Sequence, residues 1–473
     1  MILLWRQLSN RNYFWLRSFV LVLLLNIAFA ILLLLSSLMP SDVIVDRIQH
    51  AFSTGELVEN DYLPYDVHRG FHQYNDCNIL QMMTNQDSSL VAHALGPWLH
   101  MADSSATEAC RTLRELVVDR RDPGIFVSSR YTRYWHGYIP ILSMLLMFLK
   151  LSTLRAILRI SVYAAILLLL LSSIREKRFL FLTGPVFISG AFFWGLPYFG
   201  QGMSHALGDS VVMLGIACLI FWHHKFTHTS MLIPFCGLFG AVVVYFEMLT
   251  GSLPIAAGLL FSCVYVLSRL ANPSYTGIDR HLRLAILALI AFAMGAIITV
   301  GVRVLVAATL VQPSGLDAFA GNLGLYTLPI DSTTYVPGFL RPMGRLFRRG
   351  TVLTYGSHWG LTILYASVAL SWFVSLWLAY RRATRLSWAD QLAFIIGAAS
   401  VPSWTVILQT HTFMHADFMT RILIVPISLG WAAMLWQLWM TRTQIAHTIP
   451  VFPQLCQSRE QNVTWKRKNI FYA

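Results

Sequence analysis

Long apolar stretches, separated by short polar segments, follow one another along most of the chain. A run of about 20 mainly apolar residues is the length of helix that crosses the hydrocarbon core of a bilayer. The pattern therefore predicts an all-α polytopic membrane protein with about ten transmembrane helices. The expected spans are residues 18–39, 155–174, 179–197, 206–222, 231–247, 253–268, 284–308, 356–380, 391–409 and 422–440.

Two segments interrupt this pattern. Residues 40–136 are polar enough to form a large soluble loop, and residues 137–152 are apolar but too short for a span, so we expect an interfacial or re-entrant helix there. The predicted organisation is a cytoplasmic segment with the first helix, a large outer loop, a helix bundle with a second outer loop, and a cytoplasmic tail. These parts cover residues 1–39, 40–136, 137–442 (with its loop at 309–355) and 443–473.

Composition and charge agree with a membrane protein. The chain is 56% hydrophobic and 12% charged, whereas soluble domains carry about 25% charged residues. The net charge of +13 comes from basic clusters such as "REKR", "HHK" and "RRATR" beside apolar runs, which is the positive-inside pattern of cytoplasmic loops. The outer loop at 40–136 holds 13 of the 22 acidic residues and no lysine. We therefore expect the positively charged protein to interact with a lipid bilayer and not with nucleic acid.

The outer loop also contains Cys77 and Cys110. In an oxidising compartment outside the membrane, two such cysteines are expected to form a disulfide, although spacing alone leaves two free thiols as the alternative.

Most of the unusual polar residues fall on the outer side of this topology. Ionisable groups near a membrane span are by default candidates for function, whereas each one alone is more often a helix cap, an ion-pair partner or an interfacial anchor. Together they predict a one-sided ring around a cavity in the membrane. The ring comprises Asp76, Arg133, His136, His205, Asp209, Glu247, His358 and, in "HTFMHADFMTR", His411, His415, Asp417 and Arg421.

A second signal lies in the outer loop at 309–355. Its segment "FLRPMGRLFRRG" places four arginines at offsets 0, 4, 7 and 8, which share one face of a helix. These are Arg341, Arg345, Arg348 and Arg349. Guanidinium groups grip phosphate bidentately, so the face predicts a phosphate site at the lipid surface; the alternative is ordinary headgroup anchoring.

The stretches "YNDCNILQMM", "RYWHGY", "FEMLTGSLP" and "HTFMHADFMTR" resemble, in this order, a group of bacterial polytopic membrane proteins. The architecture, to about residue 440, resembles the GT-C superfamily of membrane glycosyltransferases and, more distantly, arabinofuranosyltransferases that modify type IV pilins. The resemblance implies a bacterial inner-membrane enzyme whose active site faces the periplasm. It implies a polyprenyl-phosphate sugar as donor, with arabinofuranose as a candidate sugar, and a periplasmic protein or glycan as acceptor.

The resemblance also implies roles. Such enzymes place an acidic base in the first outer loop, where Asp76 matches the motif and Asp42 and Asp46 are rivals; Glu247 is a further candidate. Arg421 and the 341–349 arginines would stabilise the phosphate leaving group. His411 and His415 would donate to phosphate or sugar.

Other functions remain open at this stage. A transporter or lipid-linked sugar flippase would use the polar ring as a pathway, and a polysaccharide ligase or polymerase would share the lipid-phosphate chemistry. His411 and His415 with Asp417 have the spacing of a metal site, but HExxH and CxxC motifs are lacking. We therefore expect neither a metal nor a cofactor.

Overall fold

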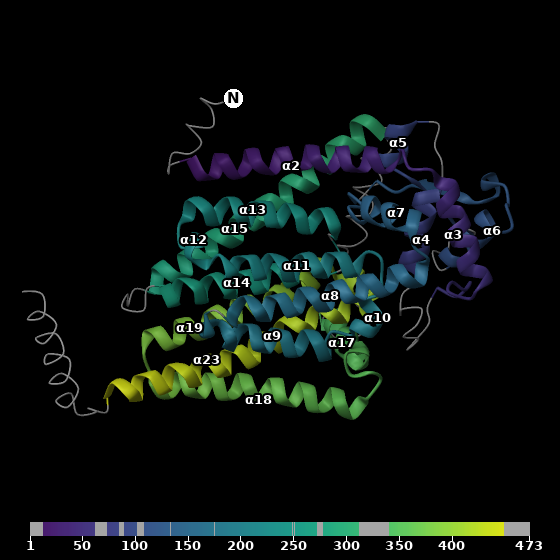
Figure 1. Ribbon diagram of the computed structural model, residues 1–473. Coiled ribbons are helices and arrows are strands. Elements are labelled where there is room, and N and C mark those ends of the chain that lie inside the picture. The colour runs from purple at the N-terminus through teal and green to yellow at the C-terminus, as the bar shows by residue number, and fades with distance from the viewer. Residues whose placement is uncertain are drawn as a thin grey trace, which may run out of the picture.

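The computed structural model describes residues 13–61, 73–84, 89–101, 108–132, 134–174, 176–247, 249, 251–271, 278–311 and 340–448. Within these residues the protein is a bundle of long helices with a smaller unit, here called the cap, at one end (Figure 1). Arg133 and most of the loop at 309–355 lie outside the described residues, as does the tail beyond residue 448.

The cap is built from residues 41–132 as far as they are described. Its helices are short and its two strands pair antiparallel, with Leu99 opposite Ser129. The elements are α3 (Ser41–Ser53), α4 (Gln73–Thr84), α5 (Leu90–Leu95), β1 (Trp98–Met101), α6 (Ala109–Val117) and β2 (Val127–Arg130).

The bundle contains the long helices and several short ones that connect them. They are α2 (Phe14–Ser36), α7 (Tyr138–Phe148), α8 (Leu151–Ile174), α9 (Leu180–Phe193), α10 (Leu196–Phe199), α11 (His205–Phe221), α12 (His223–Phe226), α13 (Thr229–Phe246), α14 (Ser252–Ala271), α15 (Ile278–Val306), α17 (Leu340–Arg349), α18 (His358–Arg382), α19 (Arg385–Ala398), α20 (Ser400–Ile407), α21 (Gln409–Met414), α22 (Ala416–Met419) and α23 (Ile424–Thr448).

Eight helical segments of the described chain are long and apolar enough to cross a membrane. They are Phe14–Ser36, Leu151–Ile174, Thr229–Phe246, Ser252–Ala271, Arg280–Val311, His358–Arg382, Arg385–Ile407 and Thr420–Arg442. The protein is therefore an all-α polytopic membrane protein, as predicted. The expected count of ten is not confirmed, because α9 and α11, in the two other expected spans, have only 14 and 17 residues.

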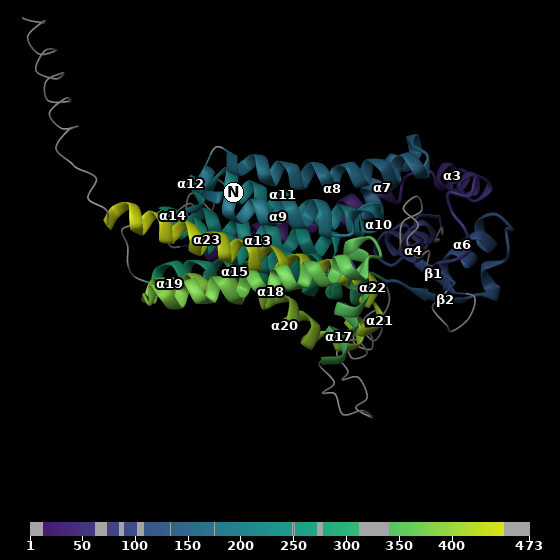
Figure 2. The ribbon, with the colours of Figure 1, turned by 90° about the horizontal axis from the view of Figure 1, so that it is seen from below.

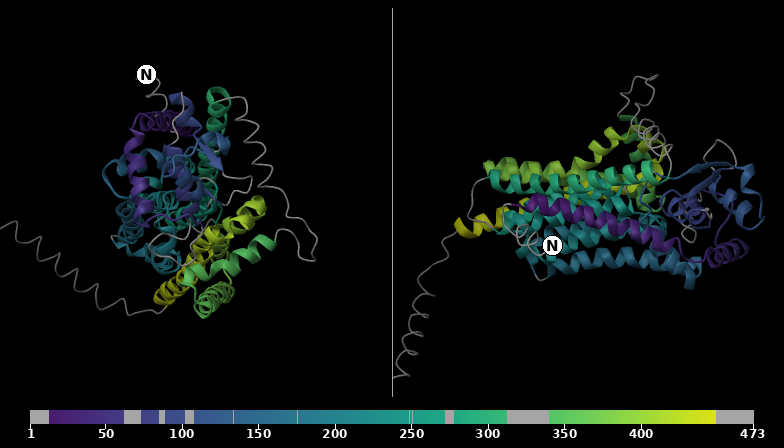
Figure 3. Two further views of the ribbon diagram at one scale, coloured as in Figure 1. Left: turned by 90° about the vertical axis from the view of Figure 1, so that its right-hand side faces the viewer. Right: turned by 90° about the horizontal axis from the view of Figure 1, so that it is seen from above.

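The ends of the bundle differ in character. From above, α2 runs the length of the bundle and leads into the cap (Figure 3, right). The short basic helix α12 and the turn from α18 to α19 lie at the end opposite the cap in two perpendicular views (Figures 1 and 2). That end therefore carries the "HHK" and "RRATR" clusters of the sequence.

Close helix contacts in the bundle depend on small residues. A Cβ atom on Gly295 of α15 would lie 1.9 Å from the Gly237 carbonyl oxygen of α13, and one on Gly240 would lie 2.0 Å from the Phe292 carbonyl oxygen. Glycine therefore lets these two backbones touch, as is usual where membrane helices pack. Helix α2 joins them through Asn26, whose side chain donates to Thr299 Oγ1 at 3.1 Å.

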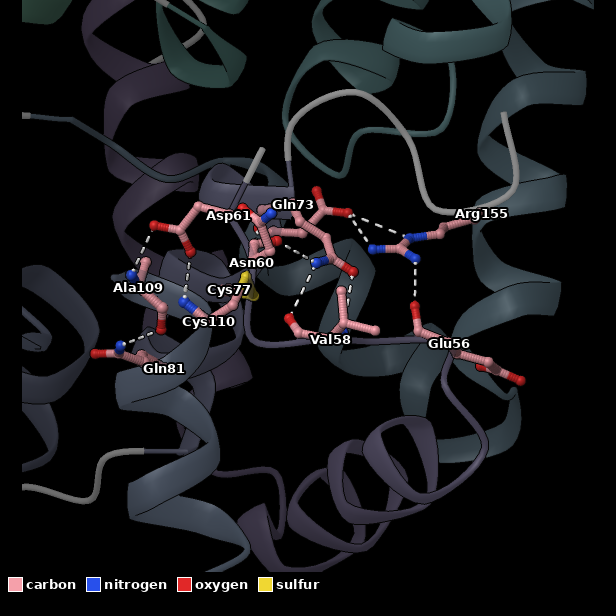
Figure 4. Close-up of a disulfide and its surroundings, with 11 residues drawn as sticks. Glu56, Val58, Asn60, Asp61, Gln73, Cys77, Gln81, Ala109, Cys110 and Arg155 are labelled. Carbon is pink, nitrogen blue, oxygen red and sulfur yellow. Dashed lines mark hydrogen bonds and ion pairs between the residues drawn. A yellow bond between two sulfur atoms is a disulfide. The ribbon is translucent and has the colours of Figure 1, made fainter. Parts of the chain in front are cut away.

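Polar contacts and one covalent bond cross-link the segments of the cap (Figure 4). Cys77 of α4 and Cys110 of α6 form a disulfide, the pairing considered from the sequence. Asp61 caps the start of α6 by accepting from the backbone N–H groups of Ala109 and Cys110, at 2.9 and 2.8 Å. These cross-links add to an apolar core in which Ile44, Leu80 and Leu113 of the cap are buried.

Candidate functional site

A pocket of about 190 Å³ lies where the cap meets the end of the bundle. Its wall is rich in aromatic and histidine side chains from both parts of the protein. The cap and its connection to the bundle contribute Tyr74, Asn75, Asn78, Ile79, Met82, Leu99, His100, Met101, Glu108, Ala109, Thr112, Ser129, Tyr131, Tyr134 and Tyr138, and the bundle contributes Ser204, Val244, Tyr245, Phe246, Glu247, Leu249, His411, His415 and Phe418.

Glu247 is the carboxylate that the bundle presents to this pocket. It follows the last residue of α13, where the chain turns to an extended conformation. Its Oε1 accepts from Arg421 and lies 3.1 Å from His205 Nδ1, and its Oε2 accepts from the Ser252 hydroxyl at 2.6 Å. The side chain is therefore fixed on both oxygens.

Arg421 connects Glu247 to a second buried carboxylate. Its Nη1 donates to Asp209 Oδ2 at 2.9 Å, and the side chains of Arg421 and Asp209 are completely buried. Ser252 also donates to Asp209, at 3.4 Å. Three segments far apart in sequence thus meet at one guanidinium, which sits just after the "HTFMHADFMT" stretch.

The backbone around this cluster leaves space only for glycine. A Cβ on Gly208 would lie 2.6 Å from Glu247 Oε2, and Gly251 adopts a φ of +132°, which L-residues rarely adopt. The sequence context "HALGDS" and "LTGS" is therefore explained by the close approach of α11 and the start of α14 to the carboxylate.

The charge state of Glu247 follows from these neighbours. Burial alone would raise the pKa of this carboxyl, but the Arg421 guanidinium and the hydrogen bond from His205 outweigh burial and hold the pKa below its ordinary value. Glu247 is therefore an ionised carboxylate at neutral pH.

The cap reaches the same cluster through Asn75 of α4. Its Nδ2 lies 3.2 Å from His205 Nε2, so His205 links an amide of the cap to Glu247 of the bundle. When Asn75 donates to Nε2, His205 carries its proton on Nδ1 and donates it to Glu247.

His411 and His415 line the opposite part of the pocket. Both lie at α21, with ring centroids 4.7 Å apart, and His415 packs against Phe418 at 4.7 Å. Of the predicted ring, Glu247, His411 and His415 line one pocket, and Glu247 contacts His205 and Arg421, which in turn contacts Asp209.

The arginine-rich segment forms α17, which packs against α21 and α22. The Arg345 guanidinium lies over the Phe413 ring, 4.4 Å from its centroid. Arg341 and Arg345 are half-buried, whereas Arg348 and Arg349 are exposed. The basic face therefore borders the histidine stretch rather than lying at a distant part of the surface.

Asp76 has a different role from the expected one. It is not among the described residues that line the pocket. Its Oδ2 accepts from Arg155 Nη2 at 2.9 Å, and its Oδ1 accepts from the backbone N–H of Met203 at 2.9 Å. This ion pair, with both side chains 3% exposed, joins the cap to the bundle, so Asp76 lies in the contact between the two parts and outside the pocket wall.

His136 is likewise a structural residue. Its Nδ1 lies 2.9 Å from the Tyr138 hydroxyl and its Nε2 lies 3.0 Å from the Tyr131 carbonyl oxygen, while the side chain is buried. In the same "RYWHGY" motif, a Cβ on Gly137 would lie 2.3 Å from the Tyr245 ring. The motif is therefore the joint between cap and bundle.

Four other residues do not fit their expected roles. Asp42 and Asp46 are exposed on α3, and His358 is exposed at the start of α18; none of the three lines the pocket. Arg421 is buried against two carboxylates, so the expected contact between Arg421 and a donor phosphate does not fit either. Arg133 lies outside the described residues, and for Asp417 only the backbone, in α22, is described.

Sequence reasoning missed the residues that complete these contacts. Asn75, Arg155 and the pocket tyrosines were not singled out, because their partners lie far away in sequence. In "YNDC" one signal was available: Asn75, Asp76 and Cys77 are consecutive and each is tied to a different segment.

In the described part of the chain, no group of three His, Cys, Asp or Glu side chains is placed to hold a metal ion. The chain matches no family model, no curated protein and no solved structure. Its function must therefore be argued from the site itself.

Proposed function

We propose that the protein is a membrane glycosyltransferase that moves a sugar from a polyprenyl-phosphate donor to an acceptor outside the membrane. One observation carries the proposal: an ionised carboxylate, Glu247, lies in the wall of a pocket between a membrane helix bundle and a cap. A lipid-linked donor reaches such a place from the bilayer, and an acceptor reaches it from water.

The chemistry assigns Glu247 the role of base. The acceptor hydroxyl oxygen attacks the anomeric carbon of the sugar, and its proton passes to Glu247 Oε2, which accepts one hydrogen bond, from Ser252, within the described structure. The bond between the anomeric carbon and the phosphate oxygen breaks, and its electron pair leaves with the phosphate. This single displacement inverts the anomeric centre.

The pocket wall suits a sugar. Tyrosine and phenylalanine rings offer flat apolar faces with polar edges, and Asn75, Asn78, His411 and His415 offer hydrogen bonds. This combination resembles neither a wholly apolar lipid site nor a strongly charged one.

Helix α17 is proposed to attract the phosphate of the lipid-linked donor to the edge of the pocket. Arg345 and Arg348 lie on a helix that borders the histidine stretch, and their guanidinium groups suit an anionic headgroup. Because Arg348 is exposed, its contribution is expected to be small and sensitive to salt.

The orientation follows the same proposal. The end with the basic clusters would face the cytoplasm and the cap would face outward, in the periplasm of a bacterium. A disulfide in the cap supports an oxidising compartment for that unit.

The test uses the purified full chain in lipid nanodiscs with polyprenyl-phosphate sugars, beginning with the arabinofuranose derivative. Transfer to peptide and glycan acceptors is followed by mass spectrometry. We expect transfer by the wild-type protein and by Asp42→Asn, an exposed control, and its loss in Glu247→Gln. Movement of the lipid between leaflets without transfer would instead identify a flippase.

A further inference from the structure

Helix α4 of the cap is fixed to the bundle at its first turn by two consecutive side chains. Asp76 accepts from Arg155 and from the backbone N–H of Met203, at 2.9 Å each. Asn75, the residue before it, lies with its Nδ2 3.2 Å from His205 Nε2. The contacts of Asp76 therefore set the position from which Asn75 meets His205, two residues after Met203.

The imidazole of His205 lies between the cap and Glu247. His205 is the first residue of α11, which is not one of the eight segments long and apolar enough to span a membrane. Its Nδ1 lies 3.1 Å from Glu247 Oε1, and its side chain is 1% exposed. The rings of Phe199 and Phe418 pack beside it, with centroids 6.4 and 5.5 Å away. Aromatic packing and polar partners at both nitrogens therefore hold the imidazole in one orientation.

The neighbours of His205 determine where its proton lies. Burial and the Arg421 guanidinium lower the pKa of His205 below its ordinary value. The carboxylates of Glu247 and Asp76 oppose this effect without outweighing it, so the imidazole is neutral at neutral pH. An ionised carboxylate can only accept, so Nδ1 carries the proton and donates it to Glu247. Nε2 is then an acceptor, and the Asn75 amide meets it with an N–H group and not with its oxygen.

The proton on Nδ1 decides which oxygen of Glu247 can react. Arg421 and His205 both donate to Oε1, and a carboxylate oxygen has two lone pairs, so Oε1 is fully used. Among the described residues Oε2 accepts only from Ser252, and it keeps one lone pair. The other tautomer of His205 would turn a lone pair toward Oε1 and repel the carboxylate.

We infer that Asn75 is a positioning residue for the base: by donating to Nε2 it keeps the proton of His205 on the side of Glu247, and so directs the proton of the acceptor hydroxyl to Oε2. The role of Glu247 as base rests on the proposed function, whereas the hydrogen-bond chain from Asn75 to Glu247 does not. Because Asn75 belongs to the cap and Glu247 to the bundle, the base is correctly oriented only when α4 is in contact with the bundle.

A purely structural role of Asn75 makes a different prediction. If Asn75 only helped to hold the cap, its replacement would lower the unfolding temperature and leave the proton of His205 in place. If Asn75 sets the tautomer, Asn75→Asp should move that proton, because a carboxylate at Nε2 requires an N–H there. With Glu247 at the other nitrogen, His205 would then hold two protons, and its pKa should be higher than in the wild-type protein.

The first measurement is NMR of the full chain in nanodiscs with isotope-labelled histidine nitrogens, which distinguishes protonated from unprotonated ring nitrogens. His205→Gln identifies the signals of His205 among those of the 15 histidines. In the wild-type protein at neutral pH we expect a protonated Nδ1 and an unprotonated Nε2. We expect both nitrogens to be protonated in Asn75→Asp, and a weaker preference for one tautomer in Asn75→Ala. Asn78→Ala, at another asparagine of α4 in the pocket wall, should leave the His205 signals unchanged.

The second measurement is the pH profile of transfer at saturating donor. Asn75→Ala should lower kcat by about three- to tenfold, the effect of one neutral hydrogen bond, with little change in the KM for the donor. Asn75→Asp should be slow at low pH, because an imidazolium beside Glu247 makes the carboxylate a weaker base. Its rate should recover as the pH rises through the raised pKa of His205, and the wild-type protein should lack this pH dependence.

The inference is overturned if His205 of the wild-type protein carries its proton on Nε2, or if neither Asn75 variant changes the His205 signals. It is also overturned if those signals change as expected while both variants keep the wild-type rate and pH profile. Should Asn75→Asp not fold, Asn75→Ala decides by the same criteria. The expected His205 signals in a protein that transfers no sugar would contradict only the proposed function.

Discussion

Arg155 Nη2 lies 2.9 Å from Asp76 Oδ2, deep between the cap and the bundle. Arg155 also donates to the Glu56 carbonyl oxygen at 2.9 Å, so one guanidinium of α8 holds two segments of the cap. The pair thus stabilises the contact between the cap and the bundle, and it does not take part in the proposed reaction.

Asp76→Asn should therefore lower the stability of the protein. It leaves the Arg155 charge buried without a counter-charge, and breaking a buried pair from one side costs about 3–5 kcal/mol. Thermal unfolding in nanodiscs measures the effect, and Asp76→Asn combined with Arg155→Met should recover part of it. An Asp76→Asn protein that is stable but inactive would restore Asp76 as the base.

Glu247→Gln should leave a folded protein with little transfer activity. Glutamine keeps the size of the side chain and can still accept from Arg421, but it cannot take a proton, and loss of a general base slows reactions by about 10²–10⁴-fold. The measurement is the rate of transfer at saturating donor. Ser252→Ala, which removes the hydrogen bonds to Glu247 and Asp209 but leaves both carboxylates, should have a much smaller effect.

Cys77→Ser, or reduction of the wild-type protein, should loosen the cap more than the bundle. The disulfide closes a separation of 33 residues, and such cross-links contribute about 2–4 kcal/mol. Hydrogen exchange should rise in α4 and α6 while α13 and α15 stay protected. Uniform exchange in all four helices would show that cap and bundle unfold as one unit.

Arg345→Gln combined with Arg348→Gln should weaken donor binding by about tenfold or less. Exposed charge pairs contribute only about 0–1 kcal/mol each, and the effect should shrink as salt is raised. Binding of the polyprenyl-phosphate donor at low and high salt measures it. Arg120→Gln, at an exposed arginine of the cap, is the control; an equal effect there would indicate general attraction by positive charge.

Acid should destabilise the protein partly through His100. Burial lowers the pKa of this histidine below its ordinary value of 6.5, so the unfolded chain binds the proton more readily than the folded protein does. The contribution to stability is present above pH 6.5 and is lost as the pH falls below it. His100→Gln should flatten unfolding temperature against pH between about 5 and 7, whereas His358→Gln, at an exposed site, should not.

The helices could be predicted from the sequence because each apolar run has to hydrogen-bond within itself in lipid. The run at 18–39 appears as α2 at Phe14–Ser36, and the short stretch at 137–152 contains the 11-residue α7. The number of membrane spans could not be predicted as well, because α9 and α11 are shorter helices than their apolar sequences suggested.

The site could be predicted only in part. Glu247, His411 and His415 were placed on one side by the order of spans, and the structure gathers them at one pocket. The ion pair of Asp76 with Arg155 could not be predicted from the sequence. The two residues are 79 positions apart, and the motif around Asp76 does not indicate which residue it contacts.

The contact between Asn26 of α2 and Thr299 of α15 bears on how the protein is made. The two residues are 273 positions apart, so α2 has entered the membrane long before α15 has been synthesised. During that interval the Asn26 amide can donate to the Val22 carbonyl oxygen within α2, 2.8 Å away, but it lacks its bond to Thr299. The contact that joins α2 to α15 can therefore form only after both helices have entered the membrane.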